Sequence, residues 1–216
     1  MQGARAALHR AIPERSWHPS PTHAQSRREA ADMISDETAY RGYLRGDQEA
    51  ADLLVERHGD ALMLYISACI KDMHEAEDLM IEAFARIFAK ERPIRGEGAF
   101  KAYLYRTARN LALRHLKKHR FIPLRIEALN FEPQFDRPVE AELDRSEDRR
   151  QLYLALRKLK PEYREALYLV YFAGLSYRSA GAVMGKSETQ ITNLVHRGKR
   201  SLKQILEREG FTYADE

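Results

Sequence analysis

Short polar side chains and arginines, the residue types that contact DNA bases, gather near the C-terminal end of the sequence. Leu175 to Arg200 reads LSYRSAGAVMGKSETQITNLVHRGKR. This pattern predicts a short helix, a turn at Gly185 and a longer helix, which together form a helix-turn-helix. Polar groups of this kind contact base edges, and lysine and arginine contact phosphates. An ordinary helical hairpin is the alternative. The expected DNA-facing residues are Ser187, Thr189, Gln190, Thr192, Asn193, His196, Arg197, Lys199 and Arg200.

A second group of cationic residues lies on a helix expected over residues 99–119. At about 100° per residue, one face of this helix is basic and polar, and the opposite face carries Phe100, Leu104 and Leu111. Cations can hold the phosphates of a nucleic-acid strand while an aromatic ring stacks on a base. A basic helix docked on an acidic partner is the alternative. The expected DNA-binding residues are Tyr103, Arg106, Arg109, Asn110, Arg114 and Lys117.

An acidic face is expected on the preceding helix, where Glu75, Asp78 and Glu82 are spaced to share one side. Carboxylates repel DNA phosphates, so this face is either solvated or a docking surface for a protein.

Signals for catalysis are poor. His115 and His119 are four residues apart, but no carboxylate or cysteine lies beside them in the sequence to complete a metal site. The chain has no glycine-rich phosphate loop and no nucleophile motif. The single cysteine, Cys69, lies on an apolar stripe and excludes both an internal disulfide and a multi-cysteine zinc site. We expect no enzyme activity, no cofactor and no metal.

Charge is distributed in blocks, although the net charge of the 216 residues is only +4. Residues 101–125 hold eight basic side chains and no acidic one, and residues 126–150 hold eight acidic and four basic ones. Residues 151–216 return to eleven basic and seven acidic side chains. This order suggests two polyanion-binding modules joined by an acidic tether. No signal peptide or membrane span is evident, so we expect a cytoplasmic protein.

Apolar residues recur at helical spacing throughout and never alternate as in strands, so we expect an all-α fold of two small helical domains. The expected helices cover about 36–44, 47–69, 72–88, 99–119, 161–173, 176–185 and 187–209. The expected organisation is a disordered extension at 1–32, a first domain at 33–122, a flexible acidic linker at 123–148 and a second domain at 149–216.

Three segments resemble conserved regions of the extracytoplasmic-function (group IV) sigma factors, members of the sigma-70 family of bacterial RNA polymerase subunits. HEAEDLMIEAFARIF at 74–88 resembles the helix of region 2 that docks on the clamp helices of polymerase β′. FKAYLYRTARNLALRHLKK at 100–118 resembles the helix that recognises and melts the −10 element. LKPEYREALYLVYFAGLSY at 159–177, with the helix-turn-helix, resembles region 4, which reads the −35 element.

The resemblance implies a promoter-specificity subunit that binds core RNA polymerase through β′ clamp helices and β flap, and then binds promoter DNA. Many members of the family also bind an anti-sigma factor. The polymerase-binding residues implied are Glu75, Asp78, Leu79, Glu82 and Phe84. The alternative function is a conventional helix-turn-helix regulator that acts without being a polymerase subunit.

The chain departs from the family pattern at several positions. Tyr103 stands where many members have tryptophan, which keeps a ring available for stacking. Ala180 and Gly181 replace a common Ile-Ala pair, and Leu194 occupies a position that is often arginine. A glycine inside a helix is expected to cost about 1 kcal/mol relative to alanine.

Overall fold

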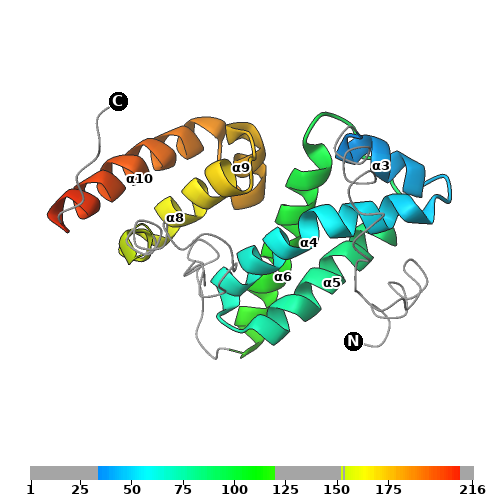
Figure 1. The fold of residues 1–216 in the computed structure, drawn as a ribbon, viewed down its shortest axis with the longest axis horizontal. Coiled ribbons are helices and arrows are strands. Elements are labelled where there is room, and N and C mark those ends of the chain that lie inside the picture. The colour runs from blue at the N-terminus through cyan, green and yellow to red at the C-terminus, as the bar shows by residue number, and fades with distance from the viewer. Residues whose placement is uncertain (1–33, 120–151, 153, 210–216) are drawn as a thin grey trace, which may run out of the picture.

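The structure of the protein is a computed structural model, which describes residues 34–119, 152 and 154–209. The described residues contain helices and no strand, so the expected all-α class is confirmed. The N-terminal group comprises α3 (Asp36–Tyr43), α4 (Gln48–Ile70), α5 (Met73–Phe88) and α6 (Ala99–His119) (Figure 1). The C-terminal group comprises α8 (Pro161–Leu167), the π-helical turn η1 (Tyr168–Phe172), α9 (Tyr177–Met184) and α10 (Glu188–Arg208). The extension expected at 1–32 and the linker expected at 123–148 lie outside the described residues.

Local capping explains why most of these helices begin where the sequence predicts. The side chains of Asp47, Asp72 and Ser176 accept hydrogen bonds from backbone N–H groups in the first turns of α4, α5 and α9. At α10, Ser187 and Gln190 form a complete capping box. Gly185 ends α9 in the left-handed conformation, with φ +69°, which costs glycine no steric strain.

The helix expected at 161–173 is not one regular α-helix. It continues from α8 into η1, where the Ala173 N–H donates to the Tyr168 carbonyl over 2.9 Å instead of to the residue four positions back. Tyr168 and Phe172 stack with ring centroids 5.6 Å apart, and the Tyr168 hydroxyl donates to the Ala61 carbonyl of α4 over 3.2 Å. The altered winding therefore accompanies a contact between the two helical groups, which no local pattern encodes.

The N-terminal helices pack around α4, which contacts α3, α5 and α6. Tyr40, Leu62, Ile66, Phe84 and Phe100 are among the fully buried side chains of this core. Burying each such side chain contributes about 1.5–3 kcal/mol before entropy costs. The core thereby holds α6 along the bundle with one face outward.

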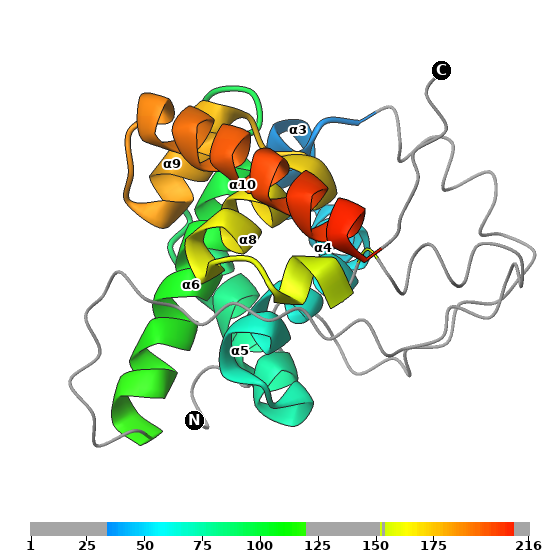
Figure 2. The ribbon, with the colours of Figure 1, turned by 90° about the vertical axis from the view of Figure 1, so that its left-hand side faces the viewer.

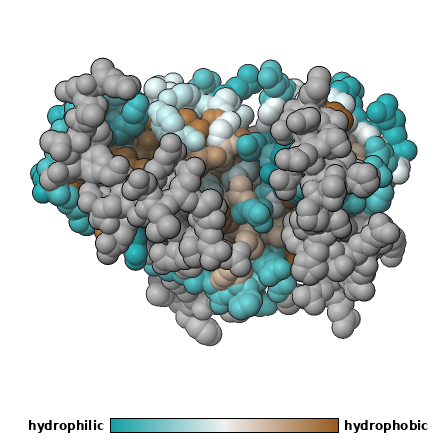
Figure 3. Space-filling view, in the orientation of Figure 1, coloured by the Kyte–Doolittle hydropathy of each residue, from teal (hydrophilic) through white to brown (hydrophobic). Residues whose placement is uncertain are grey.

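In the C-terminal group α10 runs across α8, as Figure 2 shows, and α9 packs on α10. The crossing is close at Gly198, because a Cβ added there would lie 3.2 Å from Leu167 Cδ1. On the face seen in Figure 3, hydrophobic surface occurs in small patches among hydrophilic residues. No helix of the described residues has both the length and the apolar character needed to cross a bilayer.

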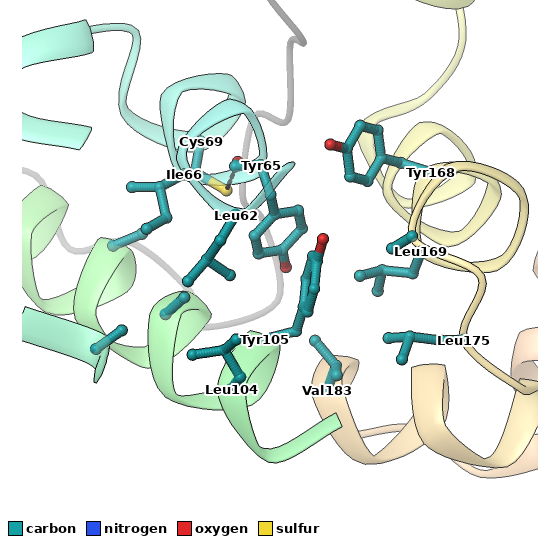
Figure 4. Close-up of a cluster of buried hydrophobic side chains, with 14 of the residues drawn as sticks. Leu62, Tyr65, Ile66, Cys69, Leu104, Tyr105, Tyr168, Leu169, Leu175 and Val183 are labelled. Carbon is teal, nitrogen blue, oxygen red and sulfur yellow. Dashed lines mark hydrogen bonds between the residues drawn. The ribbon is translucent and has the colours of Figure 1, made fainter. Parts of the chain in front are cut away.

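The two groups contact each other chiefly where α9 lies on α6, and their buried side chains form one continuous cluster. Figure 4 shows this junction, with Tyr65 and Tyr105 of the N-terminal group facing Tyr168, Leu169 and Val183 of the C-terminal group. The sequence predicts two helical units but not this direct contact between them.

Candidate nucleic-acid interface

The helix-turn-helix is held together at Gly181, where α9 meets the turn that precedes α10. The Lys186 N–H donates to the Gly181 carbonyl over 2.9 Å. A Cβ added at Gly181 would lie only 2.6 Å from the Lys186 carbonyl oxygen and 3.6 Å from Ile191 Cγ1. Replacing Gly181 with alanine would therefore not simply recover the expected helix-propensity cost of glycine, because the nearby backbone leaves no room for a methyl group. Ala180 is fully buried beside it.

The outer face of α10 is polar and exposed, whereas Ile191 and Val195 are buried against the rest of the unit. Leu194 is half-buried and packs against the core, so it does not contribute to the polar face. The structure places on the exposed side all nine expected residues: Ser187, Thr189, Gln190, Thr192, Asn193, His196, Arg197, Lys199 and Arg200.

Local contacts orient some of these side chains. Ser187 and Gln190 hydrogen-bond each other's backbone in the capping box, and the Thr192 hydroxyl donates to the Glu188 carbonyl over 3.0 Å. The Lys199 ammonium lies 5.6 Å from the centroid of the Tyr171 ring, which is 54% exposed. His196 and Arg197 project from the middle of the polar face. This arrangement suits contacts to both base edges and phosphates.

The basic face of α6 is only partly open. Arg106, Asn110, Arg114 and Lys117 are exposed. Tyr103 is half-buried, and its hydroxyl accepts a 2.5 Å hydrogen bond from Lys90 Nζ. The four exposed residues line one side of the helix and present cations and an amide to solvent, as a phosphate-binding surface requires.

Arg109 departs from the expected arrangement. Its side chain is 6% exposed, and its guanidinium binds the Glu165 carboxylate of α8, with 2.7 Å between Nε and Oε1. Burial by itself would lower the pKa of Arg109, but the charge and hydrogen bond of Glu165 hold the pKa above its ordinary value. In this arrangement Arg109 faces Glu165 and not solvent, whereas the expected basic face would expose it.

The acidic face of α5 is present, but two residues assigned to it point inward. Glu75, Asp78 and Glu82 are half-buried, and Glu82 Oε1 accepts from Arg86 Nε over 2.9 Å. Leu79 is 8% exposed and Phe84 1%. They lie in the core because their positions on α5 face the apolar side of the bundle, so only the half-buried carboxylates remain for the docking surface expected here.

An open hollow of about 810 Å³ lies between α3 and the loop that precedes α6. Its lining is Ser35, Glu37, Arg41, Leu44, Arg45, Pro93, Ile94, Arg95, Gly96 and Glu97. Beside it, Glu37 Oε1 accepts from the Phe100 N–H over 3.2 Å, which ties the start of α6 to α3. The loop therefore borders both the hollow and the basic helix.

Sequence patterns missed two groups of interacting residues. Asp36 binds Arg57 and His58, at 2.5 and 2.8 Å, and joins α3 to α4. Glu165 receives hydrogen bonds from Arg109 and from the Tyr65 hydroxyl at 2.8 Å. The partners in both groups are distant in sequence, so the only local signal was an acidic residue on an otherwise apolar face.

The described residues hold no cluster of three or more His, Cys, Asp and Glu side chains placed to bind a metal ion. His115 Nδ1 lies 3.6 Å from Glu75 Oε2. Burial, followed by the charge of Glu165, raises the pKa of the Cys69 thiol, which donates to the Tyr65 carbonyl. Such a thiol is protonated and unreactive at neutral pH.

Comparison with known proteins adds matches over both helical groups. Residues 54–122 match the family model of sigma-70 region 2, and residues 149–202 match that of sigma-70, region 4. The chain is 34% identical over 171 residues to the ECF RNA polymerase sigma factor SigE of Mycolicibacterium smegmatis, covering 74% of this chain and 64% of the relative. It is 31% identical over 166 residues to the ECF RNA polymerase sigma factor BldN of Streptomyces coelicolor, covering 74% and 62%.

The chain thus spans just under two thirds of the length of these two relatives. A solved structure of CnrH, in complex with the cytosolic domain of CnrY, is similar in fold with a TM-score of 0.55 and 24% identity. The match covers 81% of this chain and 99% of that one.

Proposed function

Because this chain belongs to the sigma-70 family, in its extracytoplasmic-function group, we propose that it is a promoter-specificity subunit of bacterial RNA polymerase. The observation that carries the proposal is the presence, on one chain, of two family regions that each offer an exposed polar and cationic face. In this role the protein catalyses no reaction itself, and it acts in the cytoplasm with the polymerase.

In this proposal, each of the two faces binds a different promoter element. The second domain, residues 149–216, places the outer face of α10 in the major groove of the −35 element, where His196 and Arg197 contact bases. The first domain, residues 33–122, captures unstacked bases of the −10 element with the basic face of α6 and the loop bordering the hollow. Capture of the strand offsets the few kcal/mol needed to unstack each base step.

Docking on polymerase is assigned to the carboxylates of Glu75, Asp78 and Glu82, which would meet the β′ clamp helices. Leu79 and Phe84 support this surface from inside the core. The C-terminal unit would meet the β flap, and an anti-sigma factor is the proposed regulatory partner. Charge complementarity favours this assignment, because an acidic face selects a basic protein surface and rejects DNA.

The test is transcription in vitro with purified protein, core RNA polymerase and a fragmented genomic template, followed by mapping of RNA start sites. We expect new starts that share one −35 and one −10 pattern. Binding of the protein alone to duplex operators, with no new starts, would instead identify a conventional helix-turn-helix regulator.

Substitutions on α10 test the readout of the −35 element. Arg197→Ala should relax preference at a single base-pair position, because a good bidentate contact contributes about 1–3 kcal/mol of discrimination. Lys199→Ala should weaken use of all promoters more evenly and reduce the salt dependence. Lys203→Ala, at an exposed site further along α10, is the control. An equal loss on every promoter for Arg197→Ala would contradict its role in base reading.

A further inference from the structure

A buried polar cluster joins the two helical units. Glu165 of α8 projects from the C-terminal unit and receives hydrogen bonds from Arg109 of α6 and Tyr65 of α4. Arg109 belongs to the helix proposed to hold −10 DNA. We propose that the free protein adopts a closed state in which Glu165 occupies Arg109 in place of a DNA phosphate, so that the units must separate before α6 can bind a strand fully. The DNA-binding consequence rests on the proposed function, whereas the closed state does not.

The contact is specific in geometry. Glu165 Oε1 lies 2.7 Å from Arg109 Nε and 2.8 Å from the Tyr65 hydroxyl, and Oε2 lies 3.4 Å from Arg109 Nη2. Glu165 is 2% exposed, so the pair is removed from solvent screening. A carboxylate that meets a guanidinium through both oxygens imitates the way a phosphate binds arginine. Glu165 therefore competes, by charge and by shape, for the same guanidinium.

Apolar and aromatic contacts surround this cluster. The ring centroid of Tyr65 lies 5.2 Å from that of Tyr105, within the N-terminal group, and 5.8 Å from that of Tyr168, across the junction seen in Figure 4. Near the start of α6, Lys101 Nζ would lie 3.9 Å from a Cβ added at Gly174 of the C-terminal unit. The C-terminal unit therefore lies against two cations of α6, while Arg106, Asn110, Arg114 and Lys117 stay exposed.

The same junction contains features that make it easy to separate. The attraction between two buried charges is largely offset by the cost of desolvating them, so a buried ion pair adds little net stability. The Tyr105 hydroxyl is buried at the junction, and no described residue hydrogen-bonds to it. The desolvation of the ion pair and the burial of the Tyr105 hydroxyl both stop costing free energy when water or DNA reaches the junction. The contact thus favours one arrangement of the units without making it permanent.

The first experiment measures the distance between the units in the full chain. Spin labels are attached at the exposed positions of Glu77 on α5 and Lys203 on α10, in a Cys69→Ala background. The wild-type chain should give one short distance distribution. Glu165→Lys places a second positive charge against Arg109, and the ratio of open to closed molecules should rise by about a thousandfold. The distribution should then become long and broad.

The control is Glu162→Lys, which makes the same charge change one turn earlier on α8. Glu162 is half-buried and pairs with Lys186 at 3.0 Å, inside the C-terminal unit. Glu162→Lys should leave the distances between the two labels unchanged. A swapped pair, Arg109→Glu with Glu165→Lys, should restore the short distance, which separates opening from unfolding. A long distribution in the wild type, or identical distributions in Glu165→Lys and Glu162→Lys, overturns the closed state.

A second measurement tests competition with DNA, using fluorescence anisotropy and a short labelled oligothymidylate. Both lysine variants change the net charge of the chain equally, so net charge alone cannot produce a difference between them. Glu165→Lys should bind about tenfold more tightly than Glu162→Lys, the effect of one released charge-assisted contact. Equal affinities overturn the competition. A closed chain that supports no transcription with core polymerase would refute the proposed function and leave the closed state standing.

Discussion

Gly181 offers a direct test of the helix-turn-helix geometry, because helix propensity and packing predict opposite effects of Gly181→Ala. Propensity alone favours alanine in a helix by about 1 kcal/mol. The added Cβ, however, would lie 2.6 Å from the Lys186 carbonyl oxygen, closer than any stable contact of this kind. The obstacle is backbone, so it cannot turn aside as a flexible side chain would.

The turn must therefore move by several tenths of an ångström, which strains the 2.9 Å hydrogen bond from the Lys186 N–H to the Gly181 carbonyl. Overpacking of this kind typically costs about 1–3 kcal/mol. After the gain in propensity, we expect Gly181→Ala to lose up to about 2 kcal/mol of stability, or up to about 8 °C in Tm for a chain of this size. Under the proposed function, binding at the −35 element should fall as well, because α10 is displaced.

The matched control is Gly59→Ala in α4. Gly59 is also a buried glycine inside a helix, but a Cβ there would meet only Val55 Cγ1, at 4.0 Å. That substitution should stabilise the chain by about 1 kcal/mol. Both variants are compared with the wild type by urea unfolding followed by circular dichroism. A Gly181→Ala variant stabilised as much as Gly59→Ala would refute the packing argument.

Two further substitutions probe contacts at helix starts. Burial would raise the pKa of Asp36, but hydrogen bonds and charge from His58 and then Arg57 lower it. Asp36 therefore stabilises the fold above its unfolded pKa of about 3.9, and this contribution is lost as pH falls through the lower folded value. Asp36→Asn should cost about 1–3 kcal/mol at pH 7, and the deficit should shrink in urea titrations below pH about 4; a deficit independent of pH would argue against the charge effect. Ser187→Ala removes the cap that pairs with Gln190 and should cost about 1 kcal/mol in thermal unfolding, and an unchanged Tm would show that the capping box contributes nothing.

Sequence reasoning located most helices of this fold because their boundaries depend on local interactions. Asp72, Ser176 and Ser187 cap residues two or three positions ahead, and Gly185 ends α9 through its own backbone conformation. The polar outer face of α10 also follows directly from helical periodicity. Each of these features involves neighbours within about one turn, which a single sequence specifies.

Periodicity was a weaker guide to the binding faces. Arg109 lies three residues from Arg106 and so only about 60° around the helix, yet one is buried and the other exposed. The helical angle gives the direction of a side chain but not the element it meets. In the same way, Leu79 and Phe84 lie within the acidic segment of α5 and still point into the core.

The sequence by itself determined the all-α class, the order and starts of the helices, and the polar and cationic surface of the helix-turn-helix. The tertiary structure alone decided the contact of α9 with α6, the burial of Arg109 by Glu165, and the close approach that requires glycine at position 181. The physical reason is the sequence separation of the residues that interact. A cap or a turn is settled by hydrogen bonds between residues a few positions apart, whereas Glu165 reaches Arg109 across 56 residues only after both helical units have folded and docked.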